Sequence, residues 1–460
     1  MAYSAPIDPS ARKATRINLF SFASVQMRAF HMTWLAFFIC FYAWFAAAPL
    51  MPIISKQFAL SKEQVANINI AAVLVTIAVR LVIGPMCDRI GPRKTYVWLL
   101  TLGALPVFGL AFAQNYESLL FFRLAIGAIG ASFVITQYHT SVMFASNVVG
   151  TANATVGGWG NAGGGVTQST MPLIVAALVS LGVEAWWPGA QGWRVALFVP
   201  GIAMVVMAYF YWKYTQDTPQ GNLADLRAAG FEPEGGKKGG LEVFARAMKN
   251  YRVWMLAITY GGCFGVEIFI HAIAASYYVD TFGLSIVSAG YAAGTFGILA
   301  LFARALGGIV SDKVAGKHGL DGRSTLLFLL MAGEGAGLLL FSQAPTVTLA
   351  ITAMLGFGLF THMACGATYA LMPFVDRKAL GGVAGIIGAG GNAGAVLAGI
   401  LNREISSQPT CLLILGVIIM VASACSLVIR FSPAHKAGEE ELYREAMRER
   451  ALQDQQAVTA

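Results

Sequence analysis

The chain has 460 residues, of which 57% are hydrophobic and only 12% are charged, and its formal net charge at pH 7 is +8. Soluble domains carry roughly a quarter charged residues, so this composition excludes a water-soluble globular protein. A helix that crosses a bilayer needs roughly 20 mostly apolar residues, and about twelve such runs occur along the chain. We therefore predict an all-α membrane protein with twelve transmembrane helices, at approximately residues 31–54, 64–86, 95–113, 118–144, 150–180, 193–214, 251–278, 285–310, 324–342, 346–373, 379–402 and 410–431.

The basic residues are distributed unevenly among the connections between these runs. Most Lys and Arg lie in the N-terminal segment, in the tail and in the connections that follow even-numbered runs. Cytoplasmic loops of membrane proteins collect Lys and Arg, so we expect a multi-pass protein of the cell (inner or plasma) membrane with both termini in the cytoplasm. The first run is too long for the core of a cleaved signal peptide. Charge runs such as GGKKGG at 235–240 are then solvated loops, so the expected partner is the lipid bilayer and not nucleic acid.

The longest polar stretch inside the chain divides the twelve runs into two sets of six. It is rich in Gly, Pro and charged residues, a composition typical of a linker. We predict an N-terminal six-helix bundle at 1–214, a cytoplasmic linker at 215–250, a C-terminal six-helix bundle at 251–431 and a cytoplasmic tail at 432–460.

Two arginines lie inside apolar runs, Arg80 in the second and Arg304 in the eighth. Placing an arginine at mid-span costs about 2.5–3.5 kcal/mol on insertion scales, and a guanidinium group does not lose its charge. No acidic residue lies within one helical turn of either arginine on its own run, so a bound anion could offset the cost. Two planar guanidinium groups suit a small planar oxyanion, because each can pair with two oxygens side by side. The alternative is that each arginine bonds backbone carbonyls or a carboxylate elsewhere in its bundle.

The fifth and eleventh runs each carry the tetrad GNAG, centred on Asn161 and Asn392, which are 231 residues apart. The pattern R-x3-G-x3-D-[RK], which begins at each arginine, recurs after 224 residues. Two motifs that recur in the same order and at nearly equal displacements indicate an internal repeat, as membrane transporters often have.

The glycines around these asparagines would let helices approach closely, while an amide in hydrocarbon must find partners. Asn161 and Asn392 therefore either contact the anion or tie helices together. We assign both to the candidate anion site, together with the neighbouring glycines Gly160, Gly163 and Gly391.

The seventh run carries a stripe of Tyr260, Phe264, Glu267 and His271. Spacings of four, three and four place these side chains on one helical face. An aromatic stripe is usually core packing, whereas a carboxylate within a span is costly unless it is paired or protonated. Glu267 either pairs with an arginine or binds and releases a proton during a transport cycle, and His271 is its candidate partner in that role.

Several of these segments resemble a known family. GPMCDRIGPRK (84–94) resembles the loop motif after the second helix of the major facilitator superfamily, and GGIVSDKVAGKHG (307–319) is a weaker copy after the eighth. GWGNAGGGVTQ (158–168), GAGGNAGAVLAG (388–399) and FAAAPLMPII (45–54) are similar to motifs of its nitrate/nitrite porter branch, most closely of the assimilatory type. The resemblance covers nearly the whole chain, and it implies two pseudo-symmetric six-helix bundles around a central cavity.

The resemblance also implies roles for individual residues. In that branch, the arginines that match Arg80 and Arg304 clamp the substrate. The aromatic residues that match Tyr260 and Phe264 border the bound substrate. Phe133 in the fourth run is a further candidate wall. The residues of the loop motifs are expected to gate the movement of the bundles rather than to bind substrate: Asp88, Arg89, Arg93 and Asp312.

The expected function is secondary active import of nitrate or nitrite by alternating access. An inside-negative potential opposes entry of a monovalent anion by about 2.3 kcal/mol per 100 mV, so we favour symport with protons. Nitrate/nitrite antiport, transport of another small anion and an anion-sensing receptor without flux are the alternatives. An enzyme is not expected, because no nucleophile triad, paired carboxylates or metal-ligand spacing occurs, and neither a metal nor a cofactor is predicted. A monomer is the expected oligomeric state.

Overall fold

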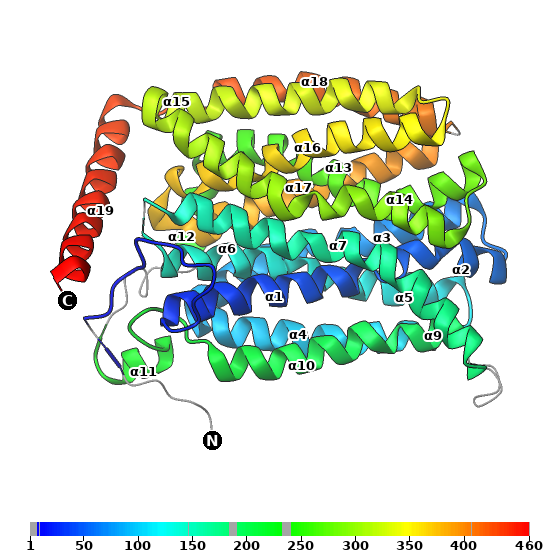
Figure 1. Ribbon diagram of the computed structural model, residues 1–460, viewed down its shortest axis with the longest axis horizontal. Coiled ribbons are helices and arrows are strands. Elements are labelled where there is room, and N and C mark those ends of the chain that lie inside the picture. Colours follow the sequence, from blue (N-terminus) through cyan, green and yellow to red (C-terminus); the bar gives the residue numbers. More distant parts are fainter. Residues whose placement is uncertain are drawn as a thin grey trace.

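The structure, a computed structural model, describes residues 7–459 apart from 9, 146, 184–190, 232–240 and 406. Long helices run side by side along the longest axis of the molecule (Figure 1). Both termini lie at the same end of these helices, which we call the terminal face. Regular structure among the described residues is helical, and the only pairings of β type are isolated bridges. The predicted charge run at 235–240 lies outside the described residues.

The first six predicted runs correspond to helices that end at Tyr214, and three of these runs are interrupted, the sixth of them at Leu197. In the first, Pro49 and Pro52 begin two short helices, because proline lacks the amide hydrogen that would continue the preceding turn. In the fourth, a 3-10 turn replaces one α-helical segment. The elements are α1 (Val25–Phe45), η1 (Ala48–Leu50), α2 (Met51–Gln57), α3 (Lys62–Ile90), α4 (Pro92–Leu110), α5 (Tyr116–Ile126), η2 (Gly127–Ala131), α6 (Ser132–Met143), α7 (Val149–Ser180), α9 (Gly192–Ala196) and α10 (Phe198–Tyr214).

The second six runs correspond to helices that begin at Tyr251. The 43-residue element α15 contains Gly319 at φ 62° and ψ −155°, a conformation that favours glycine and breaks the helical path. The chain turns there, so α15 supplies two antiparallel spans. The elements are α13 (Tyr251–Phe282), α14 (Ile286–Ile298), α15 (Ala300–Ser342), α16 (Val347–Leu371), η3 (Met372–Phe374), η4 (Arg377–Ala379), α17 (Leu380–Glu404) and α18 (Gln408–Val428).

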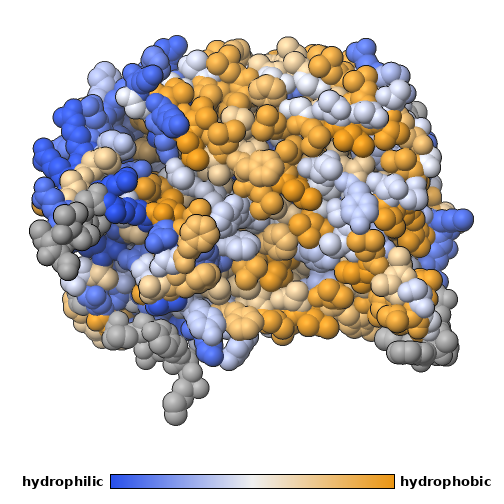
Figure 2. Space-filling view, in the orientation of Figure 1, coloured by the Kyte–Doolittle hydropathy of each residue, from blue (hydrophilic) through white to orange (hydrophobic). Residues whose placement is uncertain are grey.

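The described residues supply twelve spans. Ten stretches are long and apolar enough to cross a membrane, and one of them, Ile286–Ser342, contains the break at Gly319 and counts twice. The 19-residue helix α4 connects the second span to the fourth and is the remaining one. The outer surface fits this assignment, since large apolar side chains such as Phe121, Leu340 and Val421 are exposed and hydrophobic residues form a wide area between more hydrophilic ends (Figure 2). The predicted all-α membrane fold is therefore confirmed.

Three further helices lie at the terminal face: α11 (Leu223–Ala228), α12 (Leu241–Lys249) and α19 (Pro433–Thr459). The C-terminal helix α19 is held to loops of the second half by two ion pairs. Glu439 accepts from Arg377 at 2.5 Å, and Lys436 reaches Asp321 at 2.5 Å.

The two halves touch along two seams, where α3 packs on α17 and where α7 packs on α14 and α15. Glycines allow the close approach. A Cβ atom on Gly84, near the terminal face, would lie 2.9 Å from the carbonyl oxygen of Gly381, and one on Gly399, near the opposite face, would lie 2.8 Å from a carbon of Ile70. The halves therefore meet on both sides of the middle of the bundle, and the structure is an occluded conformation.

Candidate functional site

The two mid-span arginines, one from each half, lie against the same aromatic ring. The Cζ atom of Arg80 is 5.2 Å from the ring centroid of Phe264, and that of Arg304 is 5.8 Å from it. The two guanidinium carbons are therefore no further apart than the sum of these distances. Both arginines are fully buried. The two arginines occupy matching positions in the internal repeat, 224 residues apart.

Four aromatic side chains surround the arginines. Tyr260 and Phe264 on α13 stack with an interplanar angle of 4° and a centroid distance of 4.8 Å. Phe133 on α6 lies 4.8 Å from the Cζ atom of Arg80, and Tyr369 on α16 lies 5.4 Å from that of Arg304. The hydroxyl groups of Tyr260 and Tyr369 share a hydrogen bond of 2.7 Å. We call these four residues the aromatic box. Cation–π contacts of this kind contribute about 2 kcal/mol when the partners are desolvated, so the box offsets part of the cost of burying two cations.

Arg304 has a protein carboxylate as its partner. Its guanidinium group donates to Glu267 and to the hydroxyl group of Tyr369. Arg304 and Glu267 are both fully buried. Removing one partner of such a pair costs roughly 3–5 kcal/mol, because the other charge is left without compensation. For Arg304 the structure thus shows the alternative that the sequence left open, a carboxylate on another helix.

Arg80 is held differently. Its Nε and Nη2 atoms donate to the carbonyl oxygen of Gly130 at 3.1 and 2.9 Å, and Nη1 donates to the carbonyl oxygen of Gly388. No carboxylate of the described residues forms an ion pair with it. Because Gly388 belongs to α17 and Gly130 to η2, this guanidinium group bridges the two halves of the protein.

Histidines flank Glu267 on its remaining sides. His362 on α16 places Nδ1 3.5 Å from Oε2 of Glu267, while its Nε2 lies 2.9 Å from the carbonyl oxygen of Phe296. His271 on α13 places Nε2 4.0 Å from Oε1 of Glu267. The thiol of Cys365 lies 3.8 Å from Oε2. The carboxylate is therefore enclosed by one permanent cation and two imidazoles that could each take a proton.

The two predicted asparagines are buried and incompletely bonded. Asn161 donates to the carbonyl oxygen of Gly157 at 2.7 Å, and its own Oδ1 has no hydrogen-bond partner among the described residues. Asn392 has no hydrogen-bond partner for either amide atom within the described part of the chain. Each asparagine lies one helical turn from a glycine that abuts the site, since a Cβ on Gly157 would be 2.5 Å from the Tyr369 ring and one on Gly388 would be 3.1 Å from the Arg80 guanidinium. An unpaired buried amide costs on the order of 1–3 kcal/mol, which a ligand could recover.

The glycines of the fifth and eleventh spans have different neighbours. Gly391 lies against the rings of Phe264 and Tyr260, where a Cβ would come within 2.7 Å of each. By contrast, Gly160 and Gly163 face α1, where a Cβ would lie 2.2 Å from a ring carbon of Phe37 and 2.2 Å from a backbone oxygen, respectively. These two glycines allow helix packing behind the site and do not line it, contrary to the assignment from sequence.

The loop-motif residues divide in a similar way. Asp312 joins the halves, because it accepts from Thr151 of α7 at 2.8 Å and pairs with Arg323 at 2.7 Å. Asp88 faces α17, 3.2 Å from the position of a Cβ on Gly381.

The two remaining loop-motif residues make contacts within the first half. Arg93 donates to Trp212 of the same half at 2.9 Å, and Arg89 is exposed, with its carbonyl oxygen bonded to Arg227. Arg93 also donates its backbone N–H to Asp217, at the start of the linker, at 2.9 Å. Within the described part of the chain its hydrogen bonds go to the first half and the linker, so the geometry does not support a gating role for it.

The candidate site inferred from the sequence includes neither Tyr369 nor His362. A signal for Tyr369 was present, because the 231-residue displacement of the GNAG tetrads also relates Tyr138 to Tyr369. For His362 we find no comparable signal, since its role depends on packing between α13 and α16.

Comparison with known proteins places this geometry in context. The family model described as Major Facilitator Superfamily matches residues 33–373 and 263–456. The chain is 37% identical over 429 residues to "High affinity nitrate transporter 2.5" of Arabidopsis thaliana, covering 93% of this chain and 83% of that protein. It is 38% identical to "High-affinity nitrate transporter 2.3" of Oryza sativa subsp. japonica, covering 85% and 75%. With "Nitrate/nitrite transporter NrtP" of Nostoc punctiforme it shares 27% identity over 92% and 97% of the two chains.

Among solved structures, the chain is similar to a bacterial homologue of the human lysosomal transporter Spinster in an inward-facing, unoccupied conformation. The TM-score is 0.66 over 89% of this chain and 99% of that one, at 15% sequence identity. This similarity supports the fold alone.

Proposed function

The chain belongs to the Major Facilitator Superfamily, and we propose that it imports nitrate, or nitrite, through the closed arginine site between its two halves. Its named relatives are transporters, not enzymes. One observation carries the proposal. Arg80 and Arg304 both lie against the ring of Phe264, and the one carboxylate at the site, that of Glu267, pairs with Arg304 and not with Arg80. A small planar anion that lies between the two guanidinium groups would neutralise the remaining charge.

The proposed site is closed in this conformation, so transport requires the halves to separate on one side at a time. The seams of α3 with α17 and of α7 with α14 and α15 are rich in glycine. Small residues let the helices of the two halves approach closely at these seams. Arg80 bonds carbonyl oxygens of both halves, and an anion that draws it away from Gly388 would link substrate binding to movement of the halves.

We propose proton symport, with Glu267 as the group that couples the two fluxes. In the empty site the carboxylate occupies Arg304, and an incoming anion competes for the same guanidinium group. Protonation of Glu267 removes its charge and frees Arg304 for the anion. His362 and His271 lie 3.5 and 4.0 Å from the carboxylate and are candidates for a second proton. Two protons per anion would reverse the opposition of the membrane potential, which is about 2.3 kcal/mol per charge per 100 mV.

Placement in the membrane follows from the charge distribution. We propose a monomer in the cell (plasma) membrane with both termini in the cytoplasm, because the connections at the terminal face carry most of the Lys and Arg. The terminal face is then the cytoplasmic face. Bundles at 1–214 and 251–431, with the linker at 215–250 and the tail at 432–460, are the corresponding domains.

Uptake of labelled nitrate into proteoliposomes tests the proposal. We expect an inward proton gradient to accelerate uptake, and Arg80→Lys and Arg304→Lys to abolish it, because lysine keeps the charge and loses the two-pronged donor. Arg123→Lys is the matched control. Arg123 is also buried, and its guanidinium group makes one hydrogen bond among the described residues, to the carbonyl oxygen of Trp44 at 2.9 Å, which lysine can replace.

The outcomes separate the alternatives. Uptake that ignores the proton gradient and accelerates with nitrite inside the vesicles would replace symport by antiport. Nitrate binding without flux would indicate a receptor, and wild-type uptake in both lysine variants would overturn the arginine clamp.

A further inference from the structure

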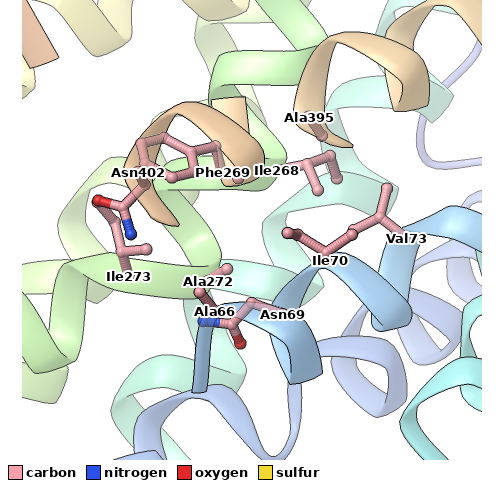
Figure 3. Close-up of a pocket in the computed structure, with 11 residues that line it drawn as sticks. Ala66, Asn69, Ile70, Val73, Ile268, Phe269, Ala272, Ile273, Ala395 and Asn402 are labelled. Atoms are coloured by element: carbon pink, nitrogen blue, oxygen red, sulfur yellow. The ribbon is translucent and has the colours of Figure 1, made fainter. Parts of the chain in front are cut away.

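A small cavity lies between α3, α13 and α17, away from the arginines (Figure 3). Its volume is about 20 Å³, and Figure 3 shows Asn69 and Asn402 on two different helices at its edge. The rest of the lining is apolar and includes Ile70, Val73 and Ile268. A cavity of this volume holds about one water molecule.

The two asparagines have an unmet hydrogen-bonding requirement at this place. The Oδ1 atoms of Asn69 and Asn402 are both buried and have no partner among the described residues. One water molecule in the cavity has two hydrogens to donate, one for each amide oxygen. The closed seam therefore contains a polar position that the protein alone does not satisfy.

The cavity lies on the same seam as the arginine site. On α3, Asn69, Val73, Thr76 and Arg80 follow spacings of four, three and four, which place them on one helical face. Asn69 precedes Arg80 by 11 residues, or about 16 Å along the helix. On α17, Gly388 lies against Arg80, and Ala395, Gly399 and Asn402 line the cavity nearer the end of the helix. The seam thus connects the arginine site with the face opposite the termini.

The residues that line the cavity are uncharged, so a ligand there would be held by the two amides. A cation within a membrane protein is usually held by a carboxylate, and none lines this cavity. The nearest charged side chain along α17 is Arg403, which contacts Asn67 of α3 at 3.4 Å and pairs with the exposed Glu404 at 2.7 Å. An amide can also donate through its NH₂ group after rotation about its last side-chain bond.

We propose that Asn69 and Asn402 form an outer anion site on the entry path. They share a water molecule when the seam is closed, and they bind a small inorganic oxyanion when α3 and α17 separate on the face opposite the termini. Neutral amides hold such an anion weakly, so it can pass on to the arginines. The inference rests on the proposed function, because the anion it names is the one that the arginines would bind.

The test measures uptake of labelled nitrate by intact cells that produce the full chain, so that the anion arrives from one side only. In Asn69→Asp and Asn402→Asp a carboxylate faces the incoming anion, and we expect the KM for external nitrate to rise at least about tenfold, since like charges in close contact oppose association. Asn115→Asp is the matched control. It adds the same charge on the same face, and Asp can still accept the capping bond from Ser118 that Asn115 accepts at 2.9 Å.

Nitrate-dependent thermal stabilisation of the purified variants reports on the arginine site. It should be unchanged in Asn69→Asp, because that site lies three turns away. A KM for Asn69→Asp and Asn402→Asp within twofold of Asn115→Asp would overturn the outer site. If the aspartate variants fail to fold, Asn69→Ser and Asn402→Ser provide the test. We expect the KM for external nitrate to rise about threefold in these variants, because the shorter side chain is a poorer donor. An unchanged KM would overturn the proposal. Absence of uptake by the wild type would instead overturn the proposed function.

Discussion

The exchange of Glu267 for a bound anion is the most demanding prediction. Glu267→Gln keeps the volume of the side chain and removes the carboxylate that pairs with Arg304. Loss of one partner of a buried ion pair costs roughly 3–5 kcal/mol, so the nitrate-free variant should unfold at a lower temperature than the wild type. Nitrate should then bind more tightly, since it no longer competes with the carboxylate. If only a third of about 4 kcal/mol is recovered on binding, affinity rises about tenfold.

Thermal unfolding in detergent with and without nitrate, and equilibrium binding of labelled nitrate, measure both effects. Uptake by the variant should also lose its acceleration by an inward proton gradient. Glu334→Gln is the matched control, because Glu334 is equally buried and neither of its carboxyl oxygens has a hydrogen-bond partner among the described residues. Weaker nitrate binding by Glu267→Gln than by the wild type, with Glu334→Gln unaffected, would refute the competition between carboxylate and anion.

Three other variants test separate parts of the structure. Tyr369→Phe removes the hydroxyl group that accepts from Arg304 in the nitrate-free site, and a hydrogen bond to a charged group is worth roughly 1.5–3 kcal/mol, so the unfolding temperature of the nitrate-free variant in detergent should fall below that of the wild type. Gly165→Ala places a Cβ 2.5 Å from a backbone nitrogen of the other half and should abolish uptake, whereas Gly356→Ala, with nothing within 4 Å of its Cβ, should retain it. Asp217→Ala leaves two backbone N–H groups without their acceptor, which costs roughly 1–3 kcal/mol for each, so its unfolding temperature should fall while uptake per folded molecule stays at the wild-type value.

The sequence was sufficient for the fold because the bilayer constrains it so strongly. Every span must satisfy its own backbone, so apolar runs of about 20 residues predict helices directly. The interruptions were not predicted. The break in the first span follows from Pro49 and Pro52, whose effect is local and could have been read from the sequence, but the 3-10 turn at Gly127–Ala131 depends on packing against α3.

The internal repeat relates Arg80 to Arg304 and Asn161 to Asn392, but it does not predict which atoms they bond. Arg80 and Arg304 occupy matching positions in the two halves, yet one bonds carbonyl oxygens and the other a carboxylate. The difference arises because Glu267 has no acidic counterpart in the first half at the repeat displacement, where residues 36–43 are AFFICFYA. Repeat symmetry therefore predicts the position of a charge, while its compensation depends on residues that the two halves do not share.

That asymmetry has a functional consequence. If both arginines were paired with carboxylates, the empty site would carry no net charge and an anion would have to displace two internal partners. If neither were paired, two uncompensated guanidinium groups would lie within contact distance of one phenylalanine ring, at a high cost in hydrocarbon. One carboxylate for two arginines leaves a single positive charge in the empty site when both histidines are neutral. One monovalent anion cancels that charge, and each proton that then binds Glu267 or a histidine restores one positive charge, so the charge of the loaded site depends on the number of protons carried with the anion.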